Sequence, residues 1–141
     1  MKKVLSVLLM VVFVFGLSSN IFSQNNKVAK KDVIKLTQYS QHELHNRSFV
    51  FFNTFIEEEQ NTFIKKDVDE DWIVGFFTTK LDNVAEEIKY KVTVNVREGE
   101  YDYNFTEVIM PEGAKNEVDK FFKRVGEVLE KTMITKEPQK L

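Results

Sequence analysis

The chain has 141 residues, with 20 basic and 22 acidic side chains, a formal net charge of −2 and no cysteine. This length is too short for two ordinary domains, and the lack of cysteine excludes disulfides, thiolate metal sites and a cysteine nucleophile. The acidic balance argues against general nucleic-acid binding, which depends on basic side chains that neutralise phosphates.

Residues 1–23 have the layout of a secretory signal peptide. Lys2 and Lys3 give a basic start, the run from Val4 to Leu17 is mostly apolar, and the small Ser23 stands at the expected cleavage point. A retained membrane anchor is the alternative, but the apolar run is shorter than the roughly 20 residues that a spanning helix needs. Without cysteine, no lipid anchor is expected at this terminus. We therefore expect a cleaved, exported protein that is periplasmic or secreted and does not span the membrane.

The rest of the chain divides into three parts. Residues 24–31 are polar and are interpreted as a flexible leader. Residues 32–135 form one folded domain, and residues 136–141, which include a proline, are interpreted as a solvated tail. The domain opens with a short strand within residues 32–38, where apolar and polar residues partly alternate.

A helix follows, and Ser40 is its expected N-cap. Ser40 and Glu43 fit the capping box, in which each side chain satisfies the backbone N–H of the other residue. The helix is expected to end near residues 57–59. Its apolar face, at helical spacing, consists of Leu44, Ser48, Phe51, Phe52 and Phe55.

Two strands come next, over residues 61–67 and 72–81, with an acidic turn at residues 68–71 between them. The second strand begins with an unbroken apolar run from Trp72 to Phe77. Because both of its faces are apolar, this strand is expected to be central or covered on both sides. Gly75 within it indicates a bulge or a bend.

The stretch from Ile88 to Met110 alternates as two strands joined by a turn at Glu98 and Gly99. Gly99 suits the positive φ of the primed two-residue turns, and such a turn fixes the register of the hairpin. The expected pairs match polar with polar and apolar with apolar: Arg97 with Glu100, Val96 with Tyr101, Asn95 with Asp102, Val94 with Tyr103, and Val92 with Phe105. The same register places Tyr90 opposite Glu107, which is the one mismatched pair.

A last helix is expected after residues 111–113, with Asn116 as its cap and Glu117 and Asp119 in its first turn. Its apolar stripe consists of Val118, Phe121, Phe122, Val125, Val128 and Leu129.

The element order β-α-β-β-β-β-α predicts an α+β fold with a single curved five-stranded antiparallel sheet. The two amphipathic helices are expected to bury their stripes on one face of that sheet. The other face is then open and polar, and it is the candidate binding surface. Its residues are Lys89, Lys91, Thr93, Asn95, Arg97, Asp102, Asn104 and Thr106.

Three stretches resemble a family of secreted proteins of unknown function from Gram-negative bacteria, described as having a TATA-box-binding-protein-like fold. They are the entry into the aromatic helix at Ser40–Leu44, the strand start at Trp72–Gly75, and the hairpin from Tyr90 to Thr106. The resemblance covers about residues 33–110. It implies the fold of that family, and because the family has no established activity, no functional residue carries over.

Two patterns contain part of a metal site, and neither is complete enough to predict one. His42 and His45 are three residues apart on a helix, but no third ligand is evident. Asp67, Asp69 and Asp71 match the start of a calcium loop, but the glycine and the final glutamate of that loop are missing.

No hydrolase or phosphate-binding motif is present. We therefore expect a non-enzymatic binding or interaction domain of the cell envelope, without a cofactor or metal and with an envelope or extracellular protein as its partner. The alternative is a carrier that holds an apolar ligand in the phenylalanine-rich space between helices and sheet. An uncharacterised hydrolase is the third choice.

Overall fold

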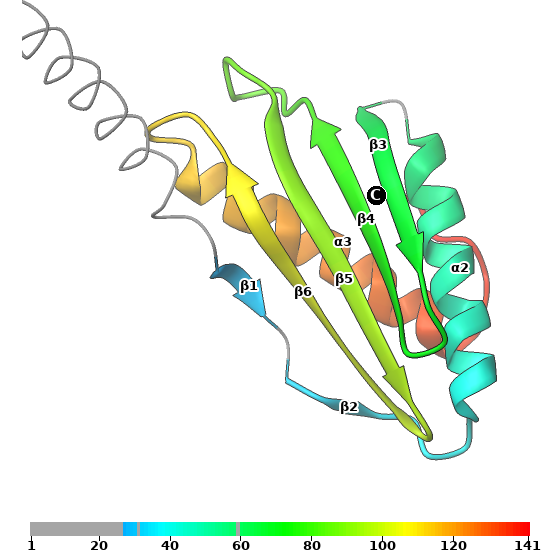
Figure 1. The fold of residues 1–141 in the computed structure, drawn as a ribbon. Coiled ribbons are helices and arrows are strands. Elements are labelled where there is room, and N and C mark those ends of the chain that lie inside the picture. The colour runs from blue at the N-terminus through cyan, green and yellow to red at the C-terminus, as the bar shows by residue number, and fades with distance from the viewer. Residues whose placement is uncertain (1–26, 31, 59) are drawn as a thin grey trace, which may run out of the picture.

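The computed structural model describes residues 27–30, 32–58 and 60–141 (Figure 1). The predicted signal peptide, residues 1–23, lies outside this part of the chain. The two helices are α2, Gln41–Glu57, and α3, Lys115–Thr135. The strands are β1, Lys27–Lys30; β2, Ile34–Lys35; β3, Asn61–Val68; β4, Trp72–Thr79; β5, Ile88–Arg97; and β6, Glu100–Ile109.

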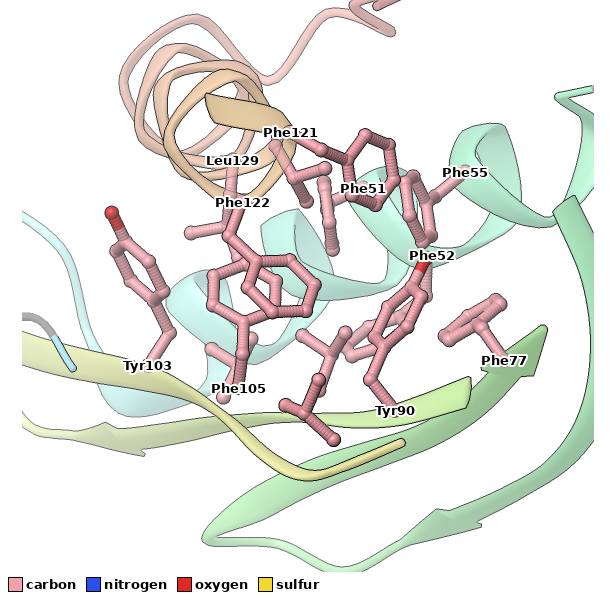
Figure 2. Close-up of a cluster of buried hydrophobic side chains, with 14 of the residues drawn as sticks. Phe51, Phe52, Phe55, Phe77, Tyr90, Tyr103, Phe105, Phe121, Phe122 and Leu129 are labelled. Carbon is pink, nitrogen blue, oxygen red and sulfur yellow. The ribbon is translucent and has the colours of Figure 1, made fainter. Parts of the chain in front are cut away.

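The strands form one open antiparallel sheet in the order β1-β6-β5-β4-β3, with β2 also beside β6. In Figure 1, α3 crosses behind the sheet and α2 runs alongside β3, and Figure 2 shows both helices above the same sheet face. The predicted α+β class, the antiparallel sheet and the placement of both helices are confirmed. Neither described helix combines the length and the hydropathy that crossing a bilayer requires.

The first part of the sheet differs from the prediction. Within residues 24–31, expected to be a flexible leader, Lys27–Lys30 pair with β6 as strand β1. The strand expected within residues 32–38 is reduced to Ile34 and Lys35. The described part of the sheet therefore has one strand more than the five predicted. Strand β1 has only four residues, Lys-Val-Ala-Lys, whose two apolar residues are adjacent, so it lacks the apolar alternation by which sequence patterns reveal strands.

Helix α2 begins with the predicted Ser40 cap, whereas the Glu43 carboxylate accepts from Arg47 and Lys136 and does not close the predicted capping box. The Ser40 hydroxyl accepts from the backbone N–H of Glu43 at 3.1 Å. The Glu98 carboxylate, at the tip of the β5–β6 hairpin, accepts from the backbone N–H of Gln41 at 3.0 Å. Two of the N–H groups that a helix start leaves without intrahelical partners are thereby satisfied, and the hairpin tip is tied to the helix.

The β5–β6 hairpin has the predicted register, including all five of the pairs from Arg97–Glu100 to Val92–Phe105. Its turn is not of the primed kind. Gly99 has a φ of 70°, whereas the only non-glycine residues with positive φ in the described chain are Glu107 and Lys136. A positive φ at the second turn position alone is the arrangement of a type II turn. The peptide of Gly99 also bonds to the chain before α2, because its N–H donates to Tyr39 O and its carbonyl accepts from Leu36 N.

The mismatched pair of Tyr90 and Glu107 is removed by a β-bulge. The register shifts between Lys89 and Lys91, and Glu107 takes a φ of 52°. The extra residue reverses the alternation of β6, so that Val108 and Met110 are buried while Glu107 points to solvent. Without the bulge, a carboxylate would face the aromatic core, which is costly for a charged group.

Replacing Glu107 with glycine should raise the free energy of unfolding by about 0.5–1 kcal/mol, because glycine adopts a left-handed backbone conformation without a Cβ penalty. The replacement also removes the exposed ion pair of Glu107 with Lys91, at 3.8 Å, but such surface pairs contribute little to stability, so the loss does not cancel the gain. Urea unfolding measures the change. Asn104→Gly, in the regular part of the pairing of β6 with β5, is the control and should destabilise. A loss of stability with Glu107→Gly would contradict the strained bulge.

Helix α3 starts earlier than predicted. Its N-cap is Ala114, without a side-chain cap bond, and Asn116 lies inside the first turn, so the Asn116 cap was wrong. A tight turn sets the start, because Ala114 N–H donates to Pro111 O and Gly113 has a φ of 83°. The predicted stripe faces the core, although Val128 is only partly buried. After the helix, Leu141 returns to the core and its N–H donates to Glu58.

The core between helices and sheet is built of aromatic rings (Figure 2). Phe105 and Phe122 stack with centroids 4.4 Å apart, and Phe55 meets Phe77 edge-on at 4.8 Å. Tyr90 lies in the middle and contacts the rings of Phe77, Phe105, Phe121 and Phe122. The phenylalanine-rich interior is therefore filled by contacting side chains.

A short chain of hydrogen bonds runs through this core. The hydroxyls of Thr79 and Tyr90 are 2.7 Å apart, and Thr79 also donates to Asn61 Oδ1 at 2.7 Å. Asn61 Nδ2 in turn donates to the carbonyl of Phe55 at 2.9 Å, which ties the end of α2 to the sheet. Burial raises the pKa of the Tyr90 phenol. The hydrogen bond with Thr79 lowers that pKa by a smaller amount, so the net shift is upward.

The protein should lose stability at alkaline pH. Burial raises the pKa of Tyr90, Tyr101 and Tyr103 in the folded chain, whereas tyrosines of the unfolded chain ionise near pH 10. The contribution of these groups is complete below about pH 10 and is lost as the pH rises through the folded values. Urea unfolding at pH 8, 10 and 11 should show this fall. Tyr90→Phe should make the fall shallower, and an unchanged slope would contradict the assignment.

Candidate functional site

The predicted surface residues lie together on the sheet face opposite the core. On β5 and β6 the register sets Lys91 beside Thr106, Thr93 beside Asn104, Asn95 beside Asp102, and Arg97 beside Glu100. No described helix packs on this face, which we call the open face. Most of its side chains are nevertheless only partly exposed.

Several polar groups of the open face bond to one another. Asp102 accepts from Asn95 Nδ2 and from Arg97, each at 2.8 Å, and Arg97 Nε donates to Glu100 at 2.9 Å. Lys35 of β2 also pairs with Glu100. The hydrogen bonds from Lys35 and Arg97 lower the pKa of Glu100, and those to Asp102 and Glu100 raise the pKa of Arg97. Asn95 and Arg97 thus brace the hairpin.

The outward residues of β4 add an apolar strip to the open face. Trp72, Val74 and Phe76 lie next to Asn95, Thr93 and Lys91 of β5, respectively. Val74 is 9% exposed and the two aromatic residues are half-buried, although no described element covers them. Lys91 Nζ lies 5.7 Å from the centroid of the Phe76 ring, within the range of a cation–π contact.

Sequence reasoning missed this aromatic strip as part of the site. It took the apolar run from Trp72 to Phe77 as a sign of a central strand, and β4 does lie between β3 and β5. The same run could have revealed the strip. A central strand with a polar outer face would alternate apolar and polar residues, so an unbroken apolar run indicates that the outer face is apolar as well. Trp72 and Phe76 are apolar residues of β4 on the face without helices.

The two patterns weighed as metal sites have other roles. His45 Nε2 lies 2.6 Å from Asp69 O, and Asn46 Nδ2 lies 3.3 Å from His42 Nε2. The acidic stretch forms the β3–β4 turn, with Asp69 N–H donating to Trp72 O. Among the described residues, no group of three or more His, Asp or Glu side chains is placed to hold a metal ion.

Two hollows lie on the surface, and the first is lined largely by polar groups whereas the second is lined by polar and apolar groups alike. One, of about 570 Å³, lies between α3 and residues 80–83 and contains charges of both signs. The other, of about 820 Å³, lies between α2 and the β3–β4 turn. Neither resembles the enclosed apolar cavity that a carrier of an apolar ligand requires.

Comparison with solved structures shows the fold. A DUF4468 family protein from Bacteroides ovatus ATCC 8483 matches with a TM-score of 0.57 at 9% identity, over 80% of this chain and 88% of that chain. A TBP-like protein from Parabacteroides distasonis ATCC 8503 matches with a TM-score of 0.53 at 11% identity, over 74% of this chain and 90% of that one. No protein-family model and no curated protein sequence matches the chain. The TATA-box-binding-protein-like fold expected from the resemblance is confirmed.

Proposed function

We propose that the protein is an exported, non-enzymatic binding domain that takes an envelope or extracellular protein partner on the open face of its sheet. The observation that carries the proposal is Trp72, a partly exposed aromatic side chain on the sheet face opposite the two helices. Tryptophan is among the residues that most often dominate the binding energy of protein interfaces. Export rests on the pattern of residues 1–23.

The charges beside the strip indicate the chemistry of the partner. Lys89 and Lys91 lie next to Thr78 and Phe76, so positive charge borders the strip on the β5 side, whereas Asp67 of β3 lies next to Val74 on the other side. A partner that presents apolar side chains flanked by carboxylates would complement this surface. Arg97 is less available, because Glu100 and Asp102 already hold its guanidinium.

The aromatic side chains that contact one another in the core, and the two hollows that lie at the surface, give the carrier alternative no specific support. A fold shared with the TATA-box binder does not imply DNA binding, since function depends on the site and not on the fold. The acidic net charge also argues against DNA as the partner.

The test compares two double variants of the mature protein in quantitative cross-linking to intact cell envelope. Trp72→Ala/Phe76→Ala removes the aromatic strip, and Lys123→Ala/Arg124→Ala changes exposed residues of α3 as a control. We expect the partner captured by the wild type to fall by about tenfold or more with the first variant and to stay unchanged with the second. Circular dichroism verifies that both variants fold. Equal capture by all three proteins would overturn the proposal.

A further inference from the structure

Strand β3 forms one end of the sheet, and the side of β3 away from β4 has no strand beside it in the described chain. Three of the exposed large hydrophobic residues lie on this strand: Phe63 is 38% exposed, Ile64 57% and Val68 45%. An edge strand offers unpaired backbone N–H and C=O groups to another chain. Apolar side chains beside such an edge increase its capacity to bind an extended peptide.

One flank of α2 runs along this edge (Figure 1). Together with the β3–β4 turn it encloses the hollow of about 820 Å³. The α2 residues that line it are Gln41, His42, His45, Asn46 and Phe49, and the others are Val68, Asp69 and Glu70. The helical positions recur at the spacing of one helix face, so α2 forms one wall of a groove, and Val68 at the end of β3 forms the other wall together with the turn residues Asp69 and Glu70.

The groove has an apolar part and an acidic part. The Phe49 ring is only partly buried and meets the His45 ring at 5.0 Å, while Lys66 Nζ lies 5.3 Å from its centroid. Val68 adds apolar surface at the end of β3. Asp69 and Glu70 supply two carboxylates at the turn, and a basic side chain would complement them.

We infer that this groove binds an extended peptide segment that adds to the edge of β3 by β-augmentation. An apolar side chain of the peptide packs against Phe49 and Val68, and a neighbouring lysine or arginine meets Asp69 and Glu70. Main-chain hydrogen bonds supply affinity in this mode, and the side-chain pockets supply specificity. The surface is separate from the open face, because Val68 pairs with the core-facing Ile73.

The bulge in β3 limits the length of the pairing. The register with β4 shifts between Phe63 and Lys65 and is regular from Lys65 to Val68. A bulge interrupts the ladder that a neighbouring strand needs, so the peptide pairs with this short segment beside the hollow.

A second copy of the chain fits the edge less well. Antiparallel pairing of two copies centred on residues 65–68 sets Lys66 of each copy opposite Asp67 of the other, so these charges do not oppose it. The same register sets the acidic turn residues Asp69 and Glu70 opposite Ile64 and Phe63, which offer no basic partner. A peptide with one basic residue avoids this conflict.

The probe is a phage-displayed random dodecapeptide library selected on the immobilised mature protein. We expect enriched sequences in which an apolar residue neighbours lysine or arginine, and a synthetic peptide of the consensus should bind the wild type. Its Kd should rise by about tenfold or more with Val68→Ser/Phe49→Ser and severalfold with Glu70→Lys. Ile134→Ser, at an exposed apolar position of α3, is the matched control and should bind like the wild type.

Backbone hydrogen exchange then tests the mode of binding. A saturating peptide should protect amides within residues 65–68 and leave those of β6 unchanged. A failed selection, or a peptide that binds wild type and Val68→Ser/Phe49→Ser equally, would overturn the inference, and so would binding that protects no β3 amide. The Trp72→Ala/Phe76→Ala variant should bind the peptide normally, so a failure here is distinguishable from a failure of the open face.

Discussion

Replacing Arg47 with methionine should lower the free energy of unfolding by about 3 kcal/mol, since the change removes a buried charged group that satisfies several acceptors. One guanidinium nitrogen of Arg47 donates to the carbonyls of Met133 and Ile134, each at 2.8 Å. These carbonyls lie in the last turn of α3, where a helix leaves acceptors without intrahelical partners. Arg47 of α2 therefore completes the C-terminus of α3, where positive charge also favours the helix dipole.

Two further contacts hold the guanidinium in place. Arg47 Nε donates to Glu43 at 3.0 Å, and the guanidinium lies 3.7 Å from the centroid of the Tyr39 ring. Glu43 also pairs with Lys136, just after α3, and the hydrogen bonds from Lys136 and Arg47 lower the pKa of the Glu43 carboxyl. The two helices are thus joined by a charged cluster at one end of the aromatic core.

Urea unfolding of three variants tests this role. Arg47→Met should lower the midpoint most, and Arg47→Lys should be intermediate because lysine keeps the charge but not the planar set of donors. Arg124→Met, at an exposed position of α3, is the control and should change stability by less than about 0.5 kcal/mol. If Arg47→Met matched this control, the cluster would have no structural role.

Patterns that act over short distances were predicted well from the sequence. The pairing of β5 with β6 follows from the turn at Glu98 and Gly99 and from alternation alone, so all five expected pairs occur in the sheet. Ser40 caps α2 for the same reason, because its partner Glu43 is only three residues away.

Features that depend on distant parts of the chain were missed. The bulge at Glu107 is one example. Regular alternation along β6 would turn the Glu107 carboxylate toward a core that other elements build, and the bulge prevents this. The role of Arg47 depends on where α3 ends, far along the chain. The same limit applies to the site. Trp72 and Phe76 lie on the outer face because the helices cover the other face of the sheet, and the pattern of β4 alone does not predict which face the helices cover. The polar residues of β5 were found because alternation alone assigns them to one face.

Replacing Gly75 with alanine should destabilise the protein by about 1–3 kcal/mol or more, because it overpacks a rigid part of the core. A Cβ at this position would lie 2.5 Å from Phe77 Cε2 and 2.8 Å from Phe52 Cε1. Both rings are fully buried and stack on each other with centroids 6.4 Å apart, so neither has free space to move into. The pairing of β4 with β5 is regular through Gly75, so no bulge is present there. The glycine makes room for the Phe52 ring of α2.

Gly126→Ala provides the comparison, because its Cβ would meet the Tyr103 hydroxyl at 2.6 Å. That hydroxyl is at the end of its side chain and donates to Glu130 at 3.2 Å. Alanine also gains roughly 1 kcal/mol in helix propensity over glycine. Gly126→Ala should therefore cost less than Gly75→Ala in urea unfolding, and Tyr103→Phe should relieve most of the remaining cost. A double-mutant cycle of Gly126→Ala and Tyr103→Phe tests this. If Gly126→Ala cost the same stability with and without Tyr103→Phe, the hydroxyl would not be the group that the new Cβ meets. If Gly75→Ala and Gly126→Ala lowered the free energy of unfolding equally, the loss would not depend on whether the side chains around the new Cβ can move.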